Sequence, residues 1–161
     1  MVSGNFSEII WIYAMNSADA FINLPDVDIE RQFVKTFVIQ RLQDRSLFEL
    51  TSERKRERFF SRLAHSQELV LKQKFVITVP HLRAEQEKSE IMRMLKTRGA
   101  GTYCYKITDS GELSGERCCI EEGIDRCVFS RMTILICTDT LAFLQTERTS
   151  GSPPRFILKA K

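Results

Sequence analysis

The chain has 161 residues, 43% of them hydrophobic and 28% charged, which is ordinary for one globular domain with a core of its own. No run approaches the ~20 apolar residues of a membrane-spanning helix, so we expect no membrane protein. The apolar stretch 9–15 has neither a basic leader nor a small-residue cleavage site. We therefore expect a cytoplasmic protein that is not processed.

The formal net charge of +3 is distributed unevenly along the chain. Residues 1–30 carry five acidic side chains and no basic one, whereas residues 31–98 carry sixteen basic and eight acidic side chains. Residues 99–152 are again acidic, with five bases and eight acids. A basic middle third favours either an anionic partner or pairing within the chain.

The five cysteines are an odd number, which fits a reducing compartment. Cys118 and Cys119 are adjacent, there is no Cys-x-x-Cys motif, and both histidines lie far away in the sequence. This spacing does not suit zinc, and we expect no metal site. Cys104 and Cys137 fall in predicted strands, where a thiol packs as a small apolar group.

Apolar spacing and turn residues predict the elements of the first 98 residues. In chain order these are a helix within 6–21 (alternatively a strand at 9–13), a connection over 23–28 ending in a cap at Asp26 or Asp28, a helix over 29–43, a helix within 47–71, a strand over 75–79, and a helix over 84–98 capped by Gly99. The phenylalanines of the two middle helices are expected to form core. Lining a ligand cavity is the alternative for Phe33, Phe37, Phe59 and Phe60.

The helix within 47–71 carries the main functional hypothesis. Thr51 or Ser52 is expected to cap its start, and basic residues then recur at steps of four and three along one side. The predicted polyanion-binding residues are Arg54, Lys55, Arg58, Arg62 and His65. Guanidinium groups stay charged and match phosphate oxygens, so nucleic acid or an acidic protein surface is the expected partner. The alternatives are a solvated helix face balanced by nearby glutamates, and arginines paired with acids of the same chain.

The last third of the chain reads mainly as strands. They are predicted over 102–108, 116–120, 129–138, 141–147 and 156–159, with a short helix over 121–127 that could alternatively present a cation-binding acidic cluster. Pro153 and Pro154 suit an edge position for the final strand. Tyr103 and Tyr105 alternate along one strand, where they either stack bases or belong to the core.

Helices early and strands late predict an α+β fold. We expect an antiparallel sheet of about four to six strands, mostly C-terminal, covered on one face by N-terminal helices. A single domain over 1–161 would hold a helical part at 6–98 and a sheet part at 75–79 and 102–159.

Motifs of the common hydrolases and nucleotide-binding enzymes are missing from the sequence. We expect no cofactor, assign no catalytic residue, and interpret the chain as a binding or regulatory protein. One alternative is a metal-dependent nuclease that uses Asp26 or Glu53, with His65 near the same face. Another is a protein-interaction module of the inhibitor or toxin-partner type.

Overall fold

The computed structural model describes residues 17–109, 115–127, 132–146 and 153–161. Its helices are α2 (Ser17–Ile22), α3 (Asp26–Phe37), α4 (Gln43–Thr51), α5 (Arg56–Val70), α6 (Ala84–Lys96) and α7 (Ile120–Cys127), with 3-10 turns at Gln40–Leu42 and Gln73–Phe75. The strands are β1 (Val76–Thr78), β2 (Tyr103–Thr108), β3 (Glu116–Cys119), β4 (Thr133–Thr138), β5 (Leu141–Gln145) and β6 (Arg155–Lys159). The predicted helix within 6–21 and the alternative strand at 9–13 lie mainly outside the described residues.

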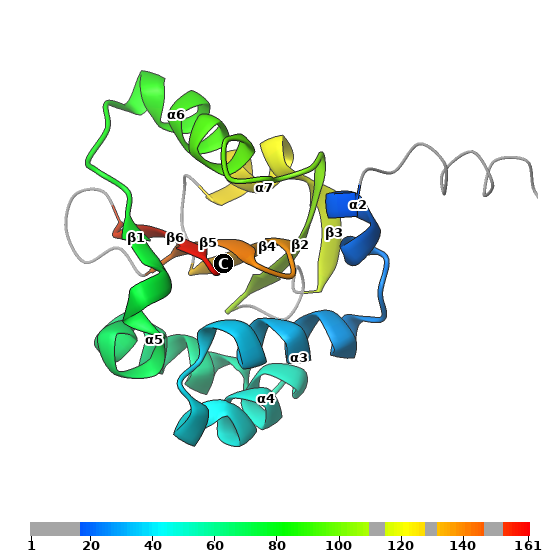
Figure 1. Cartoon of the computed structure of the whole chain (residues 1–161). Helices are drawn as coiled ribbons and strands as arrows, with labels where there is room; N and C mark the ends of the chain where they lie inside the picture. The colour runs from blue at the N-terminus through cyan, green and yellow to red at the C-terminus, as the bar shows by residue number, and fades with distance from the viewer. Residues whose placement is uncertain (1–16, 110–114, 128–131, 147–152) are drawn as a thin grey trace, which may run out of the picture.

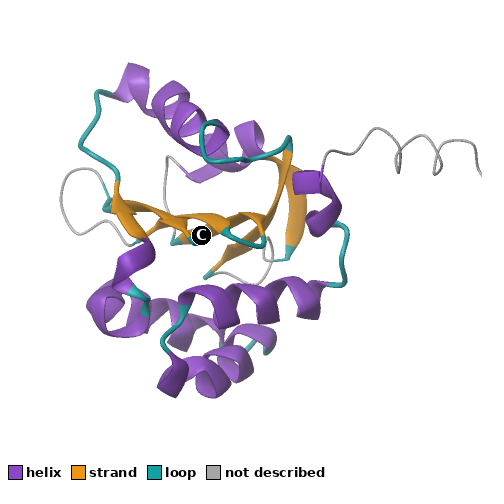
Figure 2. Cartoon of the chain, viewed as in Figure 1, coloured by secondary structure: helices purple, strands orange, loops and turns teal. Residues whose placement is uncertain are grey.

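The strands form one six-stranded antiparallel sheet (Figure 2), in the order β1-β6-β5-β4-β2-β3 (Figure 1). This arrangement, with strands mostly C-terminal, confirms the α+β prediction. The expected edge position of the last strand is wrong, because β6 lies between β1 and β5. The short strand β1 takes the edge, and the two prolines precede β6, so they remove no hydrogen bond from the sheet.

Helices cover both faces of the sheet, where the sequence predicted one covered face. The helices α3, α4 and α5 pack on one side, and α6 and α7 pack on the other (Figure 1). Successive residues of β4 supply the two cores: Ile134 and Ile136 face α3 to α5, whereas Leu135 and Cys137 face α6 and α7. Because both faces are buried, β4 and β5 are apolar on both faces between the polar residues at their ends, Thr133, Thr138 and Gln145.

The helix predicted within 47–71, with its start at Thr51 or Ser52, begins only at Arg56, and residues 43–51, expected as a connection up to Glu49, form a separate helix, α4. One helix ends at Thr51 and the next begins at Arg56, so neither Thr51 nor Ser52 caps a helix start. The Thr51 hydroxyl donates to the Leu47 carbonyl at 2.7 Å, and the Arg56 Nε donates to the Leu50 carbonyl at 2.7 Å. The Leu50 carbonyl is among the last four of α4, which lack a partner within the helix, so the Arg56 hydrogen bond stabilises the end of α4 there.

Other boundaries differ by a few residues. Asp26 and Asp28 lie in the first turn of α3 rather than capping it, and α3 ends at Phe37, before the predicted 43. The helix before Gly99, which has a φ of 103°, is confirmed, as are α7 and the hairpin of β2 and β3. Among the described residues, no helix has the length and apolar character needed to cross a membrane.

Candidate functional site

The turn between α4 and α5 presents two exposed guanidinium groups. Arg54 lies in the turn, and Arg58 lies in the first turn of α5. Neither forms an ion pair with any carboxylate of residues 17–109, 115–127, 132–146 or 153–161. Both charges are therefore available to a partner outside the described chain.

An exposed aromatic ring lies beside this turn. The Phe48 side chain, on α4, is 59% exposed, although it is large and apolar. The Lys55 ammonium group lies 3.8 Å from the centre of the Phe48 ring, a cation–π contact between the turn and α4. We call Phe48, Arg54, Lys55 and Arg58 the basic turn surface.

Arg62 does not belong to this exposed surface, contrary to the sequence prediction. Its guanidinium is bonded to the Glu49 carboxylate of α4, and the side chain is only 20% exposed. Its Nε and Nη1 are buried and donate to no acceptor among the described residues. Arg45 holds the second oxygen of Glu49 at 3.1 Å. Arg62 is thus paired with an acid of the same chain, which was one of the alternatives for the basic residues in the sequence analysis.

His65 is exposed on α5, one residue before Ser66, whose φ of −150° and ψ of 40° interrupt the helical geometry. Arg58, Arg62 and His65 all lie in α5, at the predicted steps of four and three residues along one helix. Arg54 precedes the helix, so the predicted single strip of four side chains loses its first member.

The residues considered for a nuclease are not brought into one cluster. The Asp26 carboxylate pairs with Arg117 at 2.7 Å, and Glu53 is exposed in the turn before α5. The described part of the chain contains no group of three or more His, Cys, Asp or Glu side chains arranged to hold a metal ion. The nuclease hypothesis stays a prediction.

The two tyrosines of β2 have different environments. Tyr105 is fully buried, so its ring cannot stack on a base, and its hydroxyl donates to Glu30 at 2.7 Å. Burial and this contact raise the pKa of Tyr105. Burial also raises the pKa of Glu30, while the contacts to Tyr105 and Arg56 oppose that rise. Tyr105 therefore belongs to the core, which was one of the two interpretations that the sequence offered for it.

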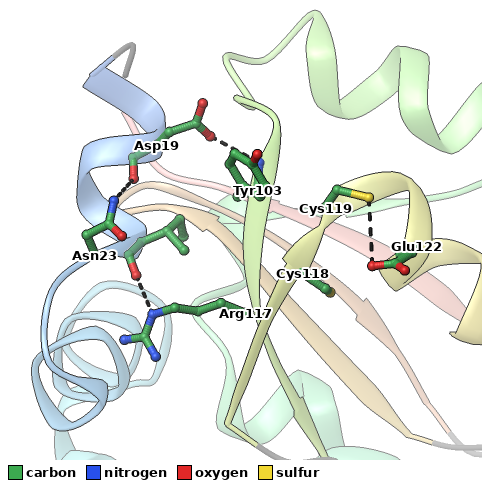
Figure 3. Close-up of a pocket in the computed structure, with 8 residues that line it drawn as sticks. Asp19, Asn23, Tyr103, Arg117, Cys118, Cys119 and Glu122 are labelled. Atoms are coloured by element: carbon green, nitrogen blue, oxygen red, sulfur yellow. Dashed lines mark hydrogen bonds between the residues drawn. The ribbon is translucent and has the colours of Figure 1, made fainter. Parts of the chain in front are cut away.

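A pocket of about 400 Å³ lies where α2 meets the β3 edge of the sheet (Figure 3). Residues of three separate chain segments line it: Asp19, Tyr103, Arg117, Cys118, Cys119 and Glu122. The buried Asp19 carboxylate accepts the backbone N–H groups of Thr102 and Tyr103 at 2.8 and 3.0 Å. Sequence reasoning missed this pocket, because no local motif links residues more than 80 positions apart.

Arg117 fastens α2 to the sheet at this pocket. Its Nε donates to the Ile22 carbonyl at 2.7 Å (Figure 3). Its Nη2 donates to the Leu24 carbonyl, also at 2.7 Å, and Nη1 pairs with Asp26. The Arg117 charge is therefore satisfied by this chain, which makes Arg117 a structural rather than a ligand-binding cation.

The cysteines predicted as core residues, Cys104 and Cys137, are both fully buried. Cys104 faces Cys118 across the β2–β3 ladder, with 3.7 Å between the two sulfur atoms. Sequence reasoning did not foresee this pairing of thiols, although a hairpin of 102–108 with 116–120 was predicted.

No protein-family model, curated protein or solved structure matches this chain.

Proposed function

We propose that this protein binds nucleic acid or another polyanion through the basic turn surface. The observation that carries the proposal is the pair of exposed guanidiniums, Arg54 and Arg58, which no described carboxylate neutralises. Every other arginine of α4 and α5 pairs with an acid: Arg45 and Arg62 with Glu49, and Arg56 with Glu30.

The chemistry of the surface suits a flexible polyanion. Guanidinium groups form paired hydrogen bonds with phosphate oxygens and keep their charge at any physiological pH. Lys55 adds a third cation, and the exposed Phe48 ring offers an apolar face on which a base can stack. Single-stranded nucleic acid combines both features, because its bases are unpaired.

Arg62 and His65 take different roles in this proposal. Arg62 acts through Glu49, holding α5 against α4 and so positioning the turn between them. His65 lies further along α5 and is exposed, where it can extend the contact with a longer ligand.

The direct test is fluorescence anisotropy with a labelled single-stranded oligonucleotide at several salt concentrations. We expect an affinity that falls steeply with salt, since each neutralised phosphate of a single strand contributes about −0.7 to the logarithmic slope. The double variant Arg54→Ala/Arg58→Ala should lose affinity and reduce the slope magnitude by about 1.4.

The matched control is Arg83→Ala/Arg93→Ala, which removes the same charge at α6, in the opposite layer. Equal losses from both double variants would show that net charge alone drives binding. A wild-type affinity that does not depend on salt would contradict the proposal.

An acidic protein surface is the second candidate, which the 59% exposure of Phe48 favours. Arginine and aromatic side chains are enriched at the centres of protein interfaces. A Phe48→Ala variant separates the two: it should abolish binding to a protein partner, whereas it should weaken nucleic acid only by the stacking of one base, about 1–3 kcal/mol.

We place this activity in the cytoplasm. The odd number of cysteines supports that location.

A further inference from the structure

Cys104 on β2 and Cys118 on β3 are directly opposite in the antiparallel ladder. Opposite residues in such a ladder have Cα atoms about 4.5–5.5 Å apart, which lies within the range that a disulfide spans. The sulfur atoms are 3.7 Å apart and need to approach to about 2.05 Å. Side-chain rotation can supply this approach, so bond formation requires no rearrangement of the strands.

The two thiols differ in access. Cys104 is fully buried, whereas Cys118 is 7% exposed and lines the pocket beside β3. A pocket of about 400 Å³ falls within the size range of small-molecule sites. Both side chains are buried in the core under α6 and α7, and Cys118, which has the larger exposure and belongs to the pocket lining, is the more accessible of the two.

The environment also favours Cys118 as the nucleophile. The hydrogen bond with Cys104 lowers the pKa of the Cys118 thiol, against the opposing effect of burial. Burial instead raises the pKa of Cys137 to about 12, and that side chain is fully enclosed. Because the thiolate is the reactive form, Cys118 should exceed Cys137 in reactivity for both reasons.

Cys119 lies in the same pocket without a thiol opposite. Its partner in the ladder is Tyr103, and its sulfur lies 4.0 Å from the Glu122 carboxylate (Figure 3). Although Cys119 is more exposed than Cys118, a disulfide within the β2–β3 ladder can form only through Cys118.

We propose that Cys104 and Cys118 form a thiol–disulfide exchange site, in which Cys118 attacks a low-molecular-weight disulfide that enters the pocket and Cys104 resolves the product. In the first step the Cys118 thiolate forms a bond to one sulfur of the small disulfide. The sulfur–sulfur bond of the reagent breaks, and the first small thiolate leaves and takes up the proton that Cys118 released.

In the second step Cys104 loses its proton and attacks the Cys118 sulfur, expelling the second small thiol. Two electrons pass from the protein dithiol to the reagent, which is reduced to two thiols. Excess small thiol reverses both steps. The product joins the edge strand β3 covalently to β2, next to the Arg117 contacts that fasten α2.

The experiment treats the native full-length protein with glutathione disulfide, alkylates remaining thiols with iodoacetamide, and maps the unreduced tryptic peptides by mass spectrometry. Cleavage at basic residues releases Cys104 in peptide 99–106 and Cys118, together with Cys119, in peptide 118–126. We expect these two peptides to be joined, with the loss of two hydrogen atoms, and to separate after treatment with dithiothreitol.

Three variants identify the sulfur atoms. Cys119→Ser is the matched control and should keep the cross-link, because it changes the neighbouring pocket thiol only. Cys118→Ser should lose it, and Cys104→Ser should accumulate a mixed disulfide between Cys118 and glutathione. Loss of the cross-link in Cys119→Ser, with retention in Cys118→Ser, would overturn the proposal.

A kinetic measurement on the wild-type protein makes the test independent of whether the variants fold. Timed alkylation of the reduced native protein with iodoacetamide should modify Cys118 at least about tenfold faster than Cys137. Equal rates for these two thiols, or no joined peptides after wild-type oxidation, would refute the assigned nucleophile and the site with it.

Discussion

Arg56 and Glu30 form a buried ion pair, with 3.0 Å between the Arg56 Nη2 and the Glu30 Oε1, that joins α5 to α3. The same glutamate oxygen accepts the Tyr105 hydroxyl of β2, and the Arg56 Nε reaches the Leu50 carbonyl at the end of α4. Three helices and the sheet therefore meet at one polar cluster inside an apolar core. The cluster fixes where α4 ends and how α5 enters the core.

The substitution Arg56→Met should destabilise the protein strongly. It removes the cation and leaves the Glu30 carboxylate, which is only 3% exposed, with the Tyr105 hydroxyl as its contact on the sheet side. Breaking a buried pair from one side typically costs about 3–5 kcal/mol. Urea unfolding followed by circular dichroism measures this free energy.

The matched control is Arg45→Met. Arg45 also pairs with a buried glutamate, but its own side chain is 63% exposed, and Glu49 keeps its contact with Arg62. An exposed partner of this kind is worth about 0–1 kcal/mol. Equal losses for the two variants would contradict the special role of the Arg56 contact.

The stability of Arg56→Met should also depend on pH in a defined direction. Burial raises the pKa of Glu30 above 4.5, so the folded state binds this proton more tightly than the unfolded state. The stability that such a carboxyl contributes is fully present below its unfolded pKa and is lost as pH rises through its folded pKa. In the wild type, Arg56 lowers the pKa of Glu30. Removing Arg56 therefore raises that pKa further and shifts the loss of stability to higher pH.

Acidification from pH 7 toward pH 5 should therefore restore part of the stability of Arg56→Met relative to the wild type. Urea midpoints measured at several pH values for both proteins provide the comparison. The double variant Arg56→Met/Glu30→Gln has no carboxyl to titrate at this position, so its difference from the wild type should change less with pH. A deficit of Arg56→Met that stays constant between pH 7 and pH 5 would exclude Glu30 as the cause.

Most of the fold could be predicted because its signals are local. Glycines and prolines mark the turns between elements, and runs of β-branched residues mark strands such as β4. The break between α4 and α5 could not be predicted, because it depends on Arg56 turning inward toward Glu30, 26 residues earlier. Helical periodicity alone counts Arg56 as one more exposed base.

The same distinction between local signals and contacts of distant residues applies to the candidate site. The exposure of Arg58 followed from its place on an amphipathic helix, whereas the pairing of Arg62 depended on Glu49 of a neighbouring helix. The pocket and its dithiol needed the strand register that sets Cys104 opposite Cys118. Register is a tertiary property, and adjacent cysteines at 118 and 119 do not reveal which of them faces Cys104.

The packing of α2 on the sheet predicts a severe effect for Gly101→Ala. A Cβ atom at position 101 would lie 2.3 Å from the Asp19 Oδ1 and 2.7 Å from its Cγ. The Asp19 carboxylate is held by two backbone N–H groups of the same turn, so it cannot retreat without losing them. We expect a loss of about 1–3 kcal/mol in the free energy of unfolding.

Asp19→Ala should reduce the additional cost of Gly101→Ala, since it removes the atoms that clash. A double-mutant cycle by urea unfolding measures this coupling. Gly99→Ala is the control in the same loop: nothing lies within 4 Å of its added Cβ, so only its φ of 103° opposes the substitution, at about 1–2 kcal/mol. Strict additivity of Asp19→Ala and Gly101→Ala would contradict the clash.

Arg58 and Arg62, one helical turn apart on α5, should respond in opposite ways to truncation. Arg58→Ala removes an exposed charge that is unpaired among the described residues, so stability should stay within about 0.5 kcal/mol while oligonucleotide affinity falls. Arg62→Ala takes one of two cations from the buried Glu49, so stability should fall by about 1–3 kcal/mol. Its salt slope should stay close to wild type, because Arg62 contacts no phosphate in the proposed complex.

Glu49→Gln separates loss of the charge pair from loss of packing. In the Arg62→Ala background it should recover part of the stability, because no carboxylate then remains buried beside the missing guanidinium. Anisotropy titrations and urea unfolding on the same preparations give both quantities. A reduced salt slope for Arg62→Ala with unchanged stability would place Arg62 in contact with the ligand instead. The binding surface would then include Arg58, Arg62 and His65 along α5, as the sequence predicted.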